Sequence, residues 1–121
     1  MSTGYQIKDQ SALYYLTLQV VDWIDIFSRL VYRDIVIDSL RYCQLNKGLQ
    51  VFAYVIMSNH VHLIANSGIS DLSNTLRDFK KFTSRNILEE IETGNESQKE
   101  WMLNRFEFAG QKHNRNEKYQ F

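Results

Sequence analysis

A chain of 121 residues is long enough for one compact domain with a modest hydrophobic core, and no shift in composition divides it into two. Apolar residues make up 44% and charged residues 23% of the sequence, and neither an export signal nor an apolar run of membrane-spanning length is present, which favours a cytoplasmic globular chain. Fourteen Lys and Arg balance fourteen Asp and Glu, which argues against a long basic surface along duplex DNA but leaves room for a local basic face.

The first predicted elements are a strand and a helix. The side chains of residues 13–21 alternate between a polar face and an apolar face, with Tyr15, Thr17 and Gln19 on the first and Leu16, Leu18 and Val20 on the second. Residues 32–45 then repeat apolar side chains at helical spacing, and Lys47 and Gly48 supply a basic last turn and a left-handed stop. Cys43 falls in this helix, where we expect a buried, unpaired thiol, as suits a reducing compartment.

The next stretch predicts two antiparallel strands joined by a tight turn. Residues 49–57 form a continuous apolar run, rich in β-formers, that is typical of a central strand, and we expect Phe52 and Tyr54 in the core. Ser58 and Asn59 form a short polar break. The following strand alternates, with Val61, Leu63 and Ala65 on one face and His60, His62, Ile64 and Asn66 on the other.

A long helix follows, and it completes the predicted architecture. Its stripe of regularly spaced side chains begins after a cap at Ser70 or Asp71 and ends near Gly94, through Leu72, Leu76, Phe79, Thr83, Ile87 and Ile91. A shorter helix over 96–108, a loop over 111–118 and a strand start at 119–121 are expected beyond it. The order strand, helix, strand, strand, helix predicts an α+β fold, a ferredoxin-like (RRM-like) sandwich with an antiparallel sheet and two main helices on one face.

His60 and His62 are the strongest candidates for chemistry. Side chains two apart on a strand point to the same face, so this spacing places two imidazoles where they can hold one metal ion. Two ligands alone bind weakly, and a working site needs a third protein ligand or substrate oxygens. The alternative is that both histidines are only polar residues on a solvated strand face.

The residues around this pair carry a resemblance to a known family. The stretch from Tyr54 to Ile64, Tyr-Val-Ile-Met-Ser-Asn-His-Val-His-Leu-Ile, closely resembles the signature of the single-tyrosine transposases with a His-hydrophobic-His motif (HUH), a family that includes the REP-associated tyrosine transposases. Ser58 stands where the family commonly has Pro. The similarity extends over roughly residues 12–90, through the opening strand and through the helix that contains Phe79-Lys80-Lys81-Phe82-Thr83.

The resemblance implies a metal-dependent DNA transposase. Such enzymes cleave and rejoin single-stranded DNA, including hairpin ends of mobile elements, through a tyrosine that becomes linked to the 5′-phosphate, with a divalent ion that polarises the phosphate. The family uses Mg²⁺ or Mn²⁺, and imidazole ligands are easier to reconcile with Mn²⁺. The resemblance also implies a homodimer and metal ligation by His60 and His62.

The catalytic residue stays unknown at this stage. Family members carry the nucleophilic tyrosine on a helix well after the histidines, in a Tyr-Ile-His-Asn-Asn-Pro or Tyr-x-x-x-Gln setting, and no such stretch is present here. Tyr119 lies at a suitable distance along the chain, but its neighbours are typical of a strand start. We therefore expect residues 1–121 to form one transposase-like domain truncated before the nucleophile helix. A non-catalytic nucleic-acid-binding or regulatory relative is the alternative, and a small-ligand-sensing domain is a third that no sequence feature favours.

Basic residues of the long helix are the candidates for DNA binding. Arg77, Lys81 and Arg85 are spaced four apart and share one helix face, with Lys80 beside them. An ordinary solvated face is the alternative interpretation. Tyr15 lies on the strand face expected to carry the histidines, where its ring could stack on an unpaired base.

Overall fold

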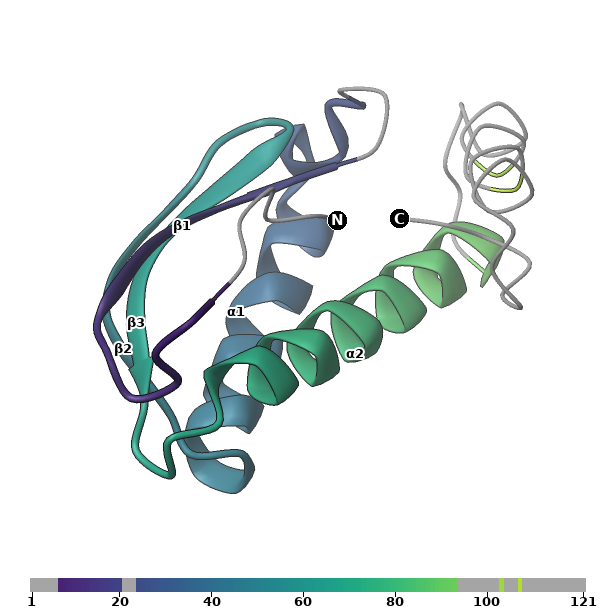
Figure 1. Cartoon of the computed structure of the whole chain (residues 1–121). Helices are drawn as coiled ribbons and strands as arrows, with labels where there is room; N and C mark the ends of the chain where they lie inside the picture. Colours follow the sequence, from purple (N-terminus) through teal and green to yellow (C-terminus); the bar gives the residue numbers. More distant parts are fainter. Residues whose placement is uncertain (1–6, 21–23, 94–102, 104–106, 108–121) are drawn as a thin grey trace.

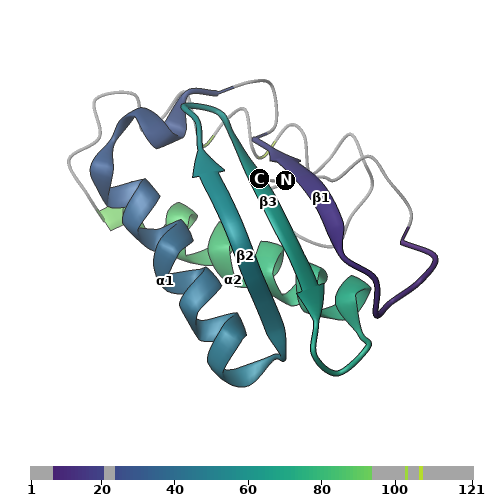
Figure 2. The ribbon, with the colours of Figure 1, turned by 90° about the vertical axis from the view of Figure 1, so that its left-hand side faces the viewer.

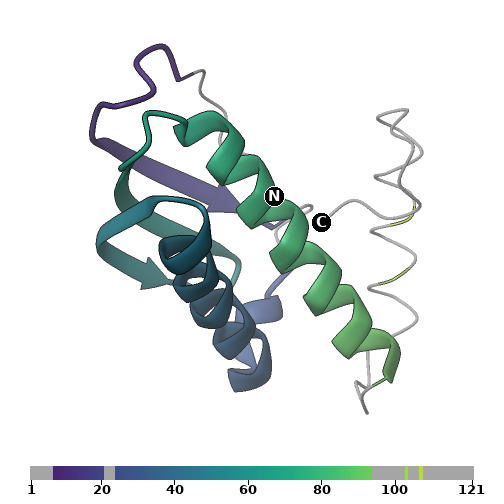
Figure 3. The same ribbon diagram turned by 90° about the horizontal axis from the view of Figure 1, so that it is seen from below.

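The computed structural model describes residues 7–20, 24–93, 103 and 107, which form a sheet covered on one face by two helices (Figure 1). The described elements are β1 (Tyr14–Gln19), the short 3-10 helix η2 (Ile26–Ser28), α1 (Leu30–Asn46), β2 (Leu49–Ile56), β3 (His60–Ser67) and α2 (Leu72–Thr93). Seen from below, α1 and α2 both lie on the same side of the strands (Figure 3). The predicted α+β architecture, an antiparallel sheet with two main helices on one face, is confirmed. Among the described residues, no helix is long and apolar enough to cross a membrane.

The sheet has the strand order β1-β3-β2, with antiparallel pairing throughout (Figure 2). The prediction that residues 49–57 form a central strand is therefore wrong for the described sheet, in which β2 lies at an edge and β3 at the centre. The register between β2 and β3 shifts between Val51 and Ala53, and Phe52 is the extra residue of this bulge. On the outer edge of β2, the N–H of Val51 donates a hydrogen bond of 3.1 Å to Oε1 of Gln44 on α1, so a helix side chain satisfies part of this edge.

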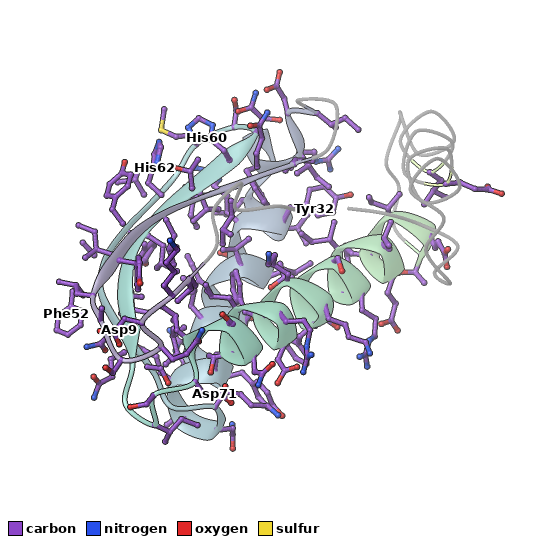
Figure 4. The ribbon with its side chains drawn as sticks, viewed as in Figure 1. Asp9, Tyr32, Phe52, His60, His62 and Asp71 are labelled. Carbon is purple, nitrogen blue, oxygen red and sulfur yellow. The ribbon has the colours of Figure 1, made fainter. Side chains whose placement is uncertain are left out.

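The placement of Phe52 and Tyr54 in the core is also wrong. Phe52 is 62% exposed on the side of the sheet away from the helices (Figure 4), and Tyr54 is 46% exposed on an edge strand that has a neighbour on one side only. The continuous apolar run is thus partly a solvent-facing surface. Leu49, at the start of the strand, is the buried exception, and Val51 and Ile56 pack partly against the core.

The core lies between the sheet and the two helices, as the alternating strand patterns predict. The helix-facing residues of β3 are fully buried, and Leu16 and Leu18 of β1 join them from the neighbouring strand. From the helix layer, the predicted stripe of α2 is buried along its whole length, through Leu72, Leu76, Phe79, Thr83, Ile87 and Ile91. Burial of these apolar side chains fixes which face of the sheet points to the helices, and so fixes the opposite face as the one that carries the histidines.

Local signals predict the ends of α1 correctly. The helix runs from Leu30 to Asn46, close to the predicted 32–45, and Gly48 has the positive φ of 73° expected of a left-handed stop. Ile69 packs against Gly48 so closely that a Cβ there would lie 2.9 Å from its Cγ1. The side chain of Thr75 donates a hydrogen bond of 3.0 Å to the carbonyl of Lys47, which joins the end of α1 to the first turn of α2. Cys43 is buried, as predicted.

The predictions for the C-terminal part are tested only at two positions. Leu103 and Glu107, within the helix expected over 96–108, are both helical. The rest of that helix, the loop over 111–118 and the strand start at 119–121 lie outside the described residues. Tyr119 and the expected truncation before a nucleophile helix therefore stay predictions.

Candidate metal and DNA site

His60 and His62 lie on the face of the sheet that points away from α1 and α2 (Figure 4). Their strand alternates strictly, with half-buried residues outside and buried residues inside, so the two imidazoles project side by side from the open face. In the pairing with β1, His62 stands opposite Thr17 and His60 opposite Gln19. The register therefore confirms the prediction that Thr17, Gln19 and the two histidines share one face of the sheet.

The two imidazoles meet through their outer nitrogens. Nε2 of His60 lies 3.0 Å from Nε2 of His62, with ring centroids 4.6 Å apart and the ring planes at 84°. This edge-on approach directs both nitrogens at a shared point rather than stacking the rings. The pair is half-buried and remains accessible from the open side of the sheet.

Each inner nitrogen is held by a separate polar side chain. Nδ1 of His60 lies 2.7 Å from Oδ1 of Asn59, and Nδ1 of His62 lies 2.9 Å from the hydroxyl oxygen of Tyr15 and 3.3 Å from that of Thr17. The ring of Tyr15 also tilts over His62, with centroids 5.5 Å apart. The contacts at Nδ1 therefore fix the orientation of both rings, and the two Nε2 atoms face each other.

The turn that presents Asn59 and His60 is fastened to the segment between β1 and α1. The N–H of Val20 donates to the carbonyl of Asn59 at 2.9 Å, and the N–H of Phe27 donates to the carbonyl of Ser58 at 2.8 Å. The hydroxyl of Ser58 donates to Oδ1 of Asp25 at 3.0 Å. Phe27 itself is 1% exposed, so the turn is hydrogen-bonded to a residue of the hydrophobic core.

The donor set fits a divalent metal ion. Two nitrogens bound to one ion at about 2.1 Å lie about 3.0–3.4 Å apart for bond angles between about 90° and 109°. The observed separation of 3.0 Å falls in this range. Within the part of the chain that the structure describes, no third His, Cys, Asp or Glu joins the pair to make a set of three. An ion held here would therefore keep open positions for substrate oxygens or for a ligand from elsewhere.

Comparison with protein families decides the relationship. Residues 25–111, well over half of the sequence, match the family model described as transposase IS200 like. The chain belongs to the family of IS200-like transposases. Comparison with curated proteins gave no match.

Two solved structures resemble this IS200-like transposase chain in fold. One is a REP-associated tyrosine transposase bound to a REP hairpin, with a TM-score of 0.57 and 17% identity over 71% of this chain and 53% of that chain. The other is a candidate transposase from Deinococcus radiodurans R1, with a TM-score of 0.57 and 14% identity over 88% of this chain and 93% of that chain. The chain thus spans about half the length of the REP-bound protein. The resemblance noted from the sequence motif is confirmed at the level of family and fold.

The predicted DNA-binding residues lie in the other layer of the molecule. Arg77, Lys81 and Arg85 are exposed on α2, which covers the face of the sheet opposite to the histidines, and Lys80 is half-buried (Figure 1). Near the start of this row, Asp78 lies 4.0 Å from Arg77 and 3.6 Å from Lys47, so one carboxylate offsets part of the positive charge. The structure brings the two histidines together but does not bring these basic residues to them.

The open face also holds features that the sequence alone did not single out. Asn59 was predicted as part of a polar break and of the family signature but was given no role, and its contact with His60 comes from a turn docked against the β1–α1 segment. The adjacency of a carboxamide and an imidazole is the one local signal that could have suggested it. Exposed apolar side chains lie near the histidines, with Val55 opposite His62 in the β2–β3 pairing and Met57 bonded through its N–H to the carbonyl of His60, while the exposed ring of Phe52 lies on the same face farther along β2 (Figure 4).

Proposed function

We propose that this chain is the DNA-processing domain of an IS200-like transposase, which binds single-stranded DNA on its open sheet face and holds a divalent metal ion between His60 and His62. The observation that carries the proposal is the approach of the two Nε2 atoms to 3.0 Å on that face, in a chain that matches the transposase family. When bound, the ion supplies Lewis acidity to a non-bridging phosphate oxygen during cleavage and rejoining of the DNA strand.

The side chains around the site have roles in positioning DNA. The Nε2 lone pairs fix where an ion and its phosphate would lie, since their rings are oriented from behind. The exposed ring of Tyr15 and the apolar surface of Phe52, Val55 and Met57 provide area on which unpaired bases stack. Solvent-exposed aromatic and apolar side chains beside a metal pair suit a single strand better than a duplex, whose bases are already stacked.

The structural relative solved with a REP hairpin supports DNA as the partner. We extend this to hairpin ends, whose unpaired nucleotides would reach the open sheet face. Mn²⁺ is the ion that best suits two imidazole ligands, with Mg²⁺ as the second choice. We also propose a homodimer, supported by the exposed position of Tyr54 on the edge strand β2, which sedimentation equilibrium tests directly.

Titration with Mn²⁺ tests the metal site. We expect His60→Ala and His62→Ala each to weaken Mn²⁺ binding at least about 10-fold, and the double variant to abolish it, because each removes one of two protein ligands. The sequence contains three histidines, so His113→Ala is the matched control that removes the remaining imidazole. Calorimetry provides the affinities.

DNA binding is measured on the same proteins by fluorescence anisotropy of a labelled single strand. We expect the wild type to bind, and Mn²⁺ to strengthen binding in the wild type and in the control but not in the double variant. Equal Mn²⁺ affinity in all five proteins, the wild type included, would overturn the metal site. Retained DNA binding together with that result would support the non-catalytic, regulatory alternative.

A further inference from the structure

We propose that Asn59 and Tyr15 are positioning residues of the histidine pair and that their roles differ. Asn59 holds His60 in one tautomer. Tyr15, together with Thr17, forms a hydrogen bond with His62 in either of its two neutral tautomers. The inference rests on the proposed role of the pair as metal ligands. It concerns residues outside the His-hydrophobic-His motif and follows from which atoms along the chain of contacts can donate or accept a hydrogen.

The first step is the contact between Asn59 and His60. A carboxamide oxygen only accepts hydrogen bonds, so Nδ1 of His60, 2.7 Å from Oδ1 of Asn59, must carry the hydrogen. Nε2 of His60 is then left with a free lone pair directed at His62. The backbone carbonyl of Asn59 accepts a hydrogen bond from the N–H of Val20, which holds the residue beside His60.

The second step is the contact between the two imidazoles. Nε2 of His60 is an acceptor, and Nε2 of His62 lies 3.0 Å away, so the metal-free pair is satisfied when His62 donates from its Nε2. Nδ1 of His62 is then itself an acceptor. The hydroxyl of Tyr15, at 2.9 Å, must donate to it.

The third step follows from what an ion requires. A nitrogen that binds a metal carries no hydrogen, so His62 must move its hydrogen from Nε2 to Nδ1 for both Nε2 atoms to ligate the same ion. Tyr15 then changes from donor to acceptor. A hydroxyl serves both roles, whereas a carboxylate or a backbone N–H serves one, and the hydroxyl of Thr17 at 3.3 Å offers a second group with the same ability. His60 is thus the preset ligand and His62 the adjustable one.

Nitrogen NMR of the histidines tests the tautomers directly. Long-range proton–nitrogen spectra of the metal-free protein at about pH 8.5, where imidazole is neutral, should show the hydrogen of His60 on Nδ1 and that of His62 on Nε2. Addition of Zn²⁺, used as a diamagnetic probe, should move the hydrogen of His62 to Nδ1 and leave His60 unchanged. Identical tautomers in the metal-free protein would overturn the proposal.

Affinity for Mn²⁺ provides the second readout. We expect Asn59→Ala to weaken binding about 10- to 100-fold, and Asn59→Asp, which keeps an acceptor oxygen, to restore it to within about 3-fold of the wild type. The Tyr15→Phe and Thr17→Val double variant should also lose about 10- to 100-fold, with Tyr15→Phe alone losing less because Thr17 remains. Tyr42→Phe is the matched control, since Tyr42 lies on α1 in the opposite layer, where its ring stacks on Phe82.

The two readouts separate this proposal from the proposed function. Unchanged Mn²⁺ affinity in Asn59→Ala and in the Tyr15/Thr17 double variant, in proteins that bind Mn²⁺ through the histidines, would overturn the positioning roles and leave the metal site intact. Absence of Mn²⁺ binding in the wild type would instead overturn the metal site. The metal-free spectra would in that case still decide whether Asn59 and Tyr15 fix the two tautomers.

Discussion

Cys43 carries a buried thiol whose ionisation is coupled to folding. It lies in α1 with 1% of its surface exposed, and burial raises the pKa of its thiol from 9.0 to about 11, with Asp78 adding to the rise and Lys47 opposing it. Between these two pH values the thiol ionises in the unfolded chain but not in the folded one. Stability is therefore fully present below about pH 9 and falls as the pH rises towards 11.

This coupling predicts an alkaline loss of stability that depends on the thiol. We expect the wild type to lose about 2 kcal/mol more unfolding free energy than Cys43→Ala between about pH 7.5 and pH 10.5. Urea unfolding at both pH values measures the difference. The cavity left by Cys43→Ala costs the same at both pH values, so parallel losses in the two proteins would show that the thiol does not ionise on unfolding in this range.

At the residue scale, the sequence predicts burial better than it predicts partners. The placement of Cys43 follows from a helical repeat within its own segment, which is local information. The partners of His60 and His62 come from the β1–β3 register and from a turn docked against another segment, which are set by contacts between residues up to 47 positions apart. No local pattern encodes the pairing of His62 with Tyr15 and Thr17, whereas Asn59 is the sequence neighbour of His60 and only the orientation of its carboxamide depends on the docked turn.

At the element scale, the two neighbouring strands β2 and β3 show which patterns are informative. The strict alternation of β3 predicts its buried and open faces correctly, because a half-buried strand is the structure that produces it. The continuous apolar run of β2 has more than one structural solution. Whether such a strand lies at the centre or at an edge depends on which other strands pair with it, and in the described sheet β1 pairs with β3.

The alternation of β3 predicts different costs for two adjacent truncations of equal size. Leu63 is fully buried against the helices, and Leu63→Ala should cost about 2–5 kcal/mol of unfolding free energy. Ile64 lies half-buried on the histidine face, and Ile64→Ala should cost less than about 1.5 kcal/mol since its site is already open to solvent. Urea unfolding of the two variants gives the comparison. Equal costs would mean that the histidine face is packed as tightly as the core.

At the scale of the whole molecule, the candidate DNA contacts lie on two opposite faces. The histidine pair is on the open side of the sheet, while Arg77, Lys81 and Arg85 lie on α2 in the helix layer. The formal net charge is zero, so attraction to DNA must come from local groups rather than from the molecule as a whole. A strand that contacts both faces has to pass around the edge of the sheet, and only a long strand or a hairpin can do so.

This arrangement predicts that Arg77, Lys81 and Arg85, the basic row of α2, contribute to the binding of long single strands and not of short ones. A single strand of about eight nucleotides, within the usual site size of one binding module, should bind the wild type and the Arg77→Gln, Lys81→Gln, Arg85→Gln variant equally. With a strand of about 30 nucleotides, the triple variant should bind more weakly and the slope of log K against log salt should fall by about 2, since each lost phosphate contact contributes about 0.7. Arg41→Gln, an exposed change on α1, is the control and should leave the slope unchanged. Fluorescence anisotropy over a salt series measures the binding of both strands.

If the substitutions weaken binding of the short strand as much as binding of the long one, the row acts through its electrostatic field at the histidine face and not by contact. If neither strand responds, the row is an ordinary solvated helix face, and DNA is held by the sheet alone.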